Sequence, residues 1–202
     1  MGKNNIARGC LTDEMLKEMS QMKGKTFKSY EYGIHDTHRG EADQVMRINL
    51  GTFALDFSNE EKVLPLWEVG EPDGIVDEVA YFECKKVNLD EPFPYGVKTK
   101  AYMIDERIKS VRVVRNETYI EKFDFTIVMD YAFIIETYNH TYTFSRGIFY
   151  DEYFYIEKDS QEKLFTNDQV AADWSNDENS PDYDGEPGEG WVATTKRTIL
   201  EL

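Results

Sequence analysis

The stretch from Ile108 to Ile156 most constrains what this chain can fold into, because β-branched and aromatic residues dominate it. It contains no proline and a single glycine, Gly147. Such a composition predicts a meander of antiparallel β-strands. Side chains alternate between the two faces of a strand, so residues 123–131 should have one apolar and one wetter face. The apolar face would carry Phe123, Phe125, Ile127, Met129 and Tyr131, and the wetter face Asp124, Thr126, Val128 and Asp130.

Further strands are predicted on both sides of this meander. One of them contains Gly51, where the parity of the apolar residues changes, which indicates a bulge. Another contains Pro65 and is therefore expected at an edge of the sheet. The predicted strands outside the meander cover residues 26–32, 45–57, 63–69, 81–87, 97–104 and 191–202.

The chain should form a single β-rich domain over residues 1–202, with a mainly β fold. We predict an antiparallel meander that forms a barrel or a strongly curved sheet of about nine or ten strands. A two-sheet β-sandwich is the alternative. The Phe123, Phe125, Ile127 and Met129 side chains are expected to share one core with those of Phe53, Leu55 and Phe57.

One short N-terminal helix is predicted at about residues 13–23. Thr12 is a good N-cap, and Gly24 can end the helix in a left-handed conformation. Met15, Leu16, Met19 and Met22 recur at helical spacing and should form a buried stripe. The following segment, Lys23-Gly24-Lys25-Thr26-Phe27, resembles the start of the first strand in small calycin-type barrels. That resemblance implies a small barrel. The alternative function is a small-ligand carrier, a calycin-like barrel whose interior is lined by Phe and Tyr side chains.

The formal charge of −16 at pH 7 limits the choice of partners. Such a surface repels the phosphates of nucleic acids and anionic lipids, and favours a basic protein partner. We found no secretory signal and no apolar run of membrane-spanning length, and so expect a cytoplasmic protein without membrane or nucleic-acid binding. Cys10 and Cys84 have no metal-type spacing and should be reduced thiols.

An acidic segment at about residues 168–190 contains eight acidic residues and no basic one. It is expected to form a long loop without structure of its own. Exposed aromatic residues among charges are typical interface anchors, which favours a partner-binding site. The alternative is a loop that only keeps the protein in solution. The predicted partner-binding residues are Asp173, Trp174, Asp177, Glu178, Asp182, Tyr183, Asp184 and Glu186.

Catalytic and cofactor motifs were sought and none was found. His35, His38 and Glu41 are weak metal candidates, because their three-residue spacing falls in a polar loop between glycines. We therefore predict no metal, no cofactor and no catalytic residues, with an enzyme of unknown type as the third possibility. The leading hypothesis is an acidic protein that neutralises a basic partner by occlusion. Its concrete form is an immunity protein of a toxin-antitoxin pair, whose partner is a toxin domain.

Overall fold

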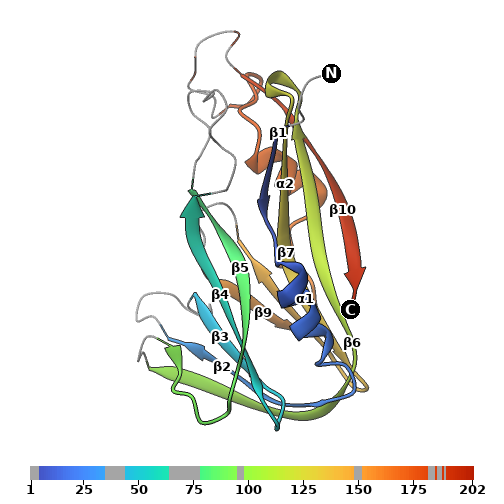
Figure 1. The fold of residues 1–202 in the computed structure, drawn as a ribbon. Coiled ribbons are helices and arrows are strands. Elements are labelled where there is room, and N and C mark those ends of the chain that lie inside the picture. The colour runs from blue at the N-terminus through green and yellow to red at the C-terminus, as the bar shows by residue number, and fades with distance from the viewer. Residues whose placement is uncertain are drawn as a thin grey trace.

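The computed structural model describes residues 5–34, 44–63, 78–94, 98–147, 152–181, 185, 188 and 190–202. These residues form ten β-strands and two α-helices (Figure 1). The first half contains β1 (Asn5–Gly9), α1 (Asp13–Ser20), β2 (Thr26–Gly33), β3 (Val45–Asn49), β4 (Ala54–Val63) and β5 (Glu78–Val87). The second half contains β6 (Thr99–Ile120), β7 (Phe125–Thr137), β8 (Thr141–Arg146), β9 (Phe154–Lys158), α2 (Asn167–Asp173) and β10 (Ala193–Glu201).

All ten strands belong to one sheet, with the order β5-β4-β3-β2-β6-β7-β8-β9. β10 also pairs with β6, and β1 pairs with β7 in the one parallel ladder among the described strands. β6 is 22 residues long and joins two halves of the sheet, because its first part pairs with β2 and its second with β7. Figure 1 shows β6 sweeping from one layer into the other. Over the described residues the sheet is strongly curved but not closed, so the mainly β prediction is confirmed without a barrel.

The predicted meander is present as β6 to β9, and the final strand is present as β10. The bulge predicted at Gly51 is wrong, because β3 ends at Asn49 and β4 begins at Ala54. Leu50 donates its N–H to Phe53 at 3.0 Å, and Gly51 has a φ of +79°, as a tight hairpin turn requires. The edge strand predicted at 63–69 falls almost entirely outside the described residues.

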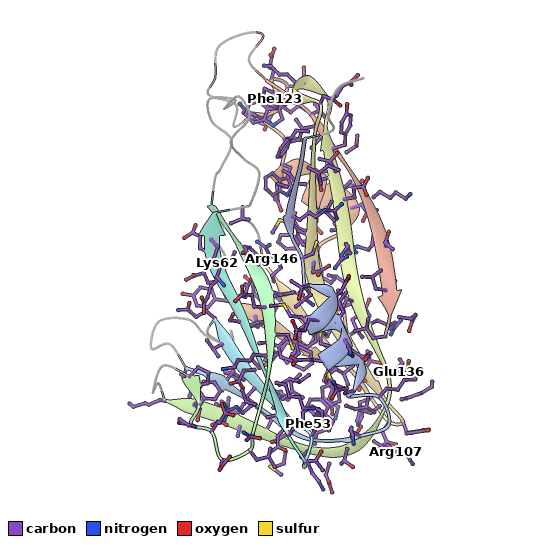
Figure 2. All side chains as sticks on the ribbon, in the orientation of Figure 1. Phe53, Lys62, Arg107, Phe123, Glu136 and Arg146 are labelled. Carbon is purple, nitrogen blue, oxygen red and sulfur yellow. The ribbon has the colours of Figure 1, made fainter. Side chains whose placement is uncertain are left out.

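Three hydrophobic clusters stabilise the fold, where one shared core was predicted: two large ones and a small one of Val114, Ala132 and Ile134. Phe133 of the first cluster stacks between Phe57 and Phe144, with ring centroids 4.3 and 4.7 Å away. This cluster also contains Phe53 and Leu55, whereas the second contains Phe125, Ile127 and Met129, with Phe123 at its margin. Figure 2 shows Phe53 and Phe123 near opposite ends of the molecule. A register shift between β6 and β7 explains the division, because a bulge bends a strand and changes the neighbours of its two parts.

The face of β7 predicted to be wetter is partly buried, which corrects that prediction. Val128 and Asp130 are almost fully covered. The Asp130 carboxylate accepts the Arg115 Nε–H at 2.7 Å and the Leu11 backbone N–H at 2.8 Å. Arg115 also donates through Nη2 at 3.0 Å, so the buried carboxylate accepts three hydrogen bonds, one of them from the segment between β1 and α1 that covers this face. Such pairing is what a buried carboxylate needs.

α1 has the predicted start and a shorter length than expected. The Thr12 Oγ1 accepts the Met15 N–H at 3.3 Å, and the helix ends at Ser20 rather than Lys23. Gly24 follows with a φ of +78°. Met19 and Met22 are fully buried in the first cluster, so the predicted apolar stripe is part of the core.

Candidate partner-binding site

The acidic segment begins with a helix, which contradicts the prediction that it has no structure of its own. Thr166 caps α2 by accepting the Gln169 N–H at 3.2 Å. The Gln169 side chain accepts the Thr166 N–H at 2.8 Å, which completes a capping box. Val170 is fully buried in the second cluster. Local capping and one apolar contact thus order a stretch whose average composition predicted disorder.

Trp174 is not the exposed anchor that the sequence predicted. Its side chain is 4% exposed and belongs to the second cluster. The indole Nε1–H donates to the Tyr131 hydroxyl at 3.3 Å. Because β7 supplies that acceptor, the burial of Trp174 depends on a residue far away in the sequence. Trp174 therefore stabilises the fold and is covered from any partner.

Glu178 also turns inward, toward the end of its own loop. Its Oε1 accepts the backbone N–H groups of Gly188 at 2.8 Å and Gly190 at 3.0 Å. Two backbone hydrogen bonds, of 2.9 and 2.8 Å, join Asn176 to Trp191 beside this contact. Hydrogen bonds thus hold the described ends of the loop together, and the Glu178 carboxylate accepts two of them.

The base of the loop is fastened to the turn between β6 and β7. Trp191 lies 5.3 Å from the ring of Phe123, and its Nε1–H donates to the Trp174 carbonyl at 2.9 Å. The Lys122 ammonium donates to the carbonyls of Gly188 at 3.2 Å and Gly190 at 3.3 Å. These contacts give the acidic segment a fixed platform on the sheet.

A cleft of about 590 Å³ opens between α2, residues 175–180 and the start of β10. Its lining combines small apolar side chains with two carboxylates, Asp168 and Asp177. Val192, another lining residue, is 57% exposed. Asp177 Oδ1 accepts the backbone N–H and the side-chain amide of Asn179, both at 2.9 Å. These hydrogen bonds lower the pKa of Asp177, so it presents a fixed negative charge at neutral pH.

Asp173 lies at the end of α2 in a less polar position. Burial raises its pKa to about 6, while the nearby charge of Arg146 acts in the opposite direction. Its Oδ2 is buried without a hydrogen-bond partner. Asp173 is thus partly covered beneath the acidic segment, and it does not line the cleft.

The remaining predicted site residues lie outside the described residues. These are Asp182, Tyr183, Asp184 and Glu186 of the acidic segment, and the metal candidates His35, His38 and Glu41. Within the part of the chain that is described, no group of three or more His, Cys, Asp or Glu side chains could hold a metal ion. Of the four predicted partner-binding residues that the structure describes, Asp177 alone lines the cleft.

Sequence reasoning missed Asp168 and Val192 as site residues. The sequence places Asp168 in the predicted acidic loop and Val192 in the predicted final strand. The structure brings them to one cleft because the bonds between Asn176 and Trp191 return the chain to α2.

Comparisons with known proteins found no matching family, no matching curated protein and no matching solved structure. None of the helices in the described residues is long and apolar enough to cross a membrane.

Proposed function

We propose that this chain is an acidic binding protein that neutralises a basic protein partner by occlusion. The observation that carries this proposal is the cleft beside α2, where the Asp168 and Asp177 carboxylates border alanine side chains and the exposed Val192. A lysine or arginine side chain could place its charge near the carboxylates and its methylene groups on the apolar lining. Trp174 plays no part in this contact, because the fold covers it.

The overall charge supports the same partner chemistry. A formal charge of −16 attracts a cationic protein over distances of about 8 Å at physiological salt, and farther at low salt. Such steering raises the rate of encounter, while close contacts in the cleft determine how long the complex lasts. A molecule with this charge is suited to fast capture of a basic surface.

In its concrete form, the proposal is a cytoplasmic immunity protein whose partner is a toxin domain with a basic active site. A nuclease is the clearest example, because its active site binds the phosphates of its substrate. Carboxylates can occupy the positions of those phosphates and keep the substrate out. No cofactor or chemical step is needed for this mechanism.

The test uses the protein encoded next to this chain's gene, which the proposal expects to be basic and toxic. Its toxicity on expression should be suppressed by the native chain and less so by the double variant Asp168→Asn, Asp177→Asn. The matched control is Asp90→Asn with Glu117→Gln, which removes the same charge from exposed positions on other elements. Equal suppression by both double variants would show that total charge matters and the cleft does not. Circular dichroism of each variant verifies that α2 is intact.

The alternative of a small-ligand carrier has less support. It needs a hollow interior, but stacked rings of Phe57, Phe133 and Phe144 fill the space between the two layers of the sheet. Over the described strands the sheet is also open.

A further inference from the structure

The outer edge of β10 is an unpaired strand edge in the described part of the molecule. β10 pairs with β6 along its whole length, from Ala193 opposite Ile120 to Glu201 opposite Arg112. No described strand pairs with its other side, and Figure 1 shows β10 at the margin of the molecule. A row of free backbone donors and acceptors is a template for another strand.

Two hydrogen bonds establish which residues of β10 point their backbone N–H and C=O groups away from β6. Leu202 donates its N–H to the Val111 carbonyl at 3.0 Å, so it belongs to a hydrogen-bonded pair with β6. Since such pairs alternate along an antiparallel ladder, Leu200 and Thr198 also face β6, whereas Ile199 and Glu201 face outward. The Ala193 N–H agrees with this assignment, because it turns away from β6 and donates to the Ser175 Oγ at 2.8 Å.

Beyond Ala193 the outward backbone groups belong to Thr195, Arg197, Ile199 and Glu201. Two of the usual protections of an edge are absent there, because the strand contains no proline and its ladder with β6 has no register shift, although Lys196, Arg197 and Glu201 carry charge. Ile199 is 45% exposed, and Glu201 is exposed as well. These are the features of a strand that pairs with another chain.

We propose that β10 pairs with β10 of a second copy of this chain, antiparallel and around a two-fold axis. Such an axis places outward-facing residues opposite each other, and charge complementarity selects one register. With Ile199 opposite Ile199, Arg197 of each copy faces Glu201 of the other. Opposite charges at directly facing positions stabilise a strand pair, and the two isoleucine side chains cover each other. The sheets of the two copies then join into one continuous sheet.

The register with Arg197 on the axis is less favourable. Moving the axis to Arg197 would place the two guanidinium groups against each other, and like charges at facing positions destabilise a strand pair. Arg197 is held in position by its own copy, since its Nε–H donates to the Asn116 Oδ1 at 3.0 Å and its Nη2 to the Phe165 carbonyl. The Arg197 side chain is thus already ordered before a second copy binds. The pairing site is separate from the cleft beside α2.

The experiment is sedimentation velocity of the full chain from low micromolar to millimolar concentration. The native chain should show a reversible monomer–dimer equilibrium. Ile199→Pro removes an outward N–H that β6 does not use, and should raise the dimer dissociation constant about tenfold or more. Ile199→Thr keeps that N–H and serves as the control, with a much smaller change. A native chain that stays monomeric at all concentrations would overturn the proposal.

A second measurement guards against a proline variant that misfolds. Under mild oxidation Ile199→Cys should form a disulfide-linked dimer, since facing residues of a strand pair lie within disulfide distance. Thr194→Cys, on the same strand but away from the two-fold axis, should not. Equal cross-linking of the two cysteine variants would contradict the proposed register.

Discussion

Gly190 is a position at which the closed loop has no room for a side chain. A Cβ atom at this position would lie 2.3 Å from Glu178 Cγ and 2.7 Å from the Asn176 carbonyl oxygen. Gly190→Ala should therefore force Glu178 and residues near Asn176 apart. We expect a loss of about 1–3 kcal/mol in the free energy of unfolding, measured by urea denaturation.

Gly188→Ala is the matched control for this prediction. Gly188 has a φ of +89°, but a Cβ atom there would meet nothing within 4 Å, so only backbone strain of about 1 kcal/mol is expected. If Gly190→Ala proved no worse than Gly188→Ala, the tie between Glu178 and the loop end would be weaker than the hydrogen bonds imply.

Asp173 predicts a specific pH dependence of stability. Its pKa is raised by burial from 3.8 to about 6, so the folded state binds a proton more tightly than the unfolded chain does. This contribution to stability is therefore complete below the unfolded pKa and is lost as the pH rises through about 6. Because the side chain is only partly buried, the effect is reduced by solvent screening. We expect the free energy of unfolding to fall by roughly 1 kcal/mol as the pH rises from below the unfolded pKa to above the folded one.

Asp173→Asn should remove that dependence and stabilise the protein at neutral pH. The measurement is thermal or urea unfolding of both proteins at pH values on either side of 6. A difference between the two proteins that did not change with pH would rule out Asp173 as the titrating group. The variant keeps a polar side chain of the same shape, so the change reports on charge.

For single residues, features set by neighbours in the sequence were predictable, whereas contacts between residues far apart in the sequence were not. The Thr12 cap and the positive φ of Gly24 follow from residues within one turn of the helix. The burial of Trp174 depends on Tyr131, and the inward turn of Glu178 depends on Gly188. No spacing rule connects residues so far apart in the sequence.

Among the elements, β7 contributes to the two large clusters, which should behave independently. Phe133 belongs to the first cluster and Phe125 to the second. Phe133→Leu and Phe125→Leu should each cost about 1 kcal/mol or more, because each leaves a partly unfilled space. Residues without shared neighbours usually have additive effects, so the double variant should match the sum within about 0.5 kcal/mol. Equilibrium unfolding of the three variants measures this, and a larger interaction energy would indicate one continuous core.

The nine described strands from β2 to β10 overlap stretches whose β-branched and aromatic residues predicted strands. β1 has five residues, and it is ordered by pairing with β7 rather than by its own pattern. α2 has seven residues and depends on a capping box together with Val170. Whether the sheet closes into a barrel depends on edges far apart in the sequence, which alternation does not describe.

For the whole molecule, the formal charge of −16 follows from the sequence alone, and the basic partner proposed from it stays a prediction. The sequence also identified the acidic segment, and Asp177 within it lines the cleft. The position of the cleft could not be predicted, because it forms where α2, residues 175–180 and β10 meet. The outward face of β10 likewise depends on its register with β6.

The most direct test of the proposed function is the association rate with the basic protein encoded beside this chain's gene, measured by stopped flow at several salt concentrations. At low salt, Asp168→Asn with Asp177→Asn should slow association several-fold more than the Asp90→Asn, Glu117→Gln control of equal charge. The difference should shrink toward physiological salt, where the screening length is about 8 Å. Identical rates for the two double variants at every salt concentration would contradict a partner site at the cleft.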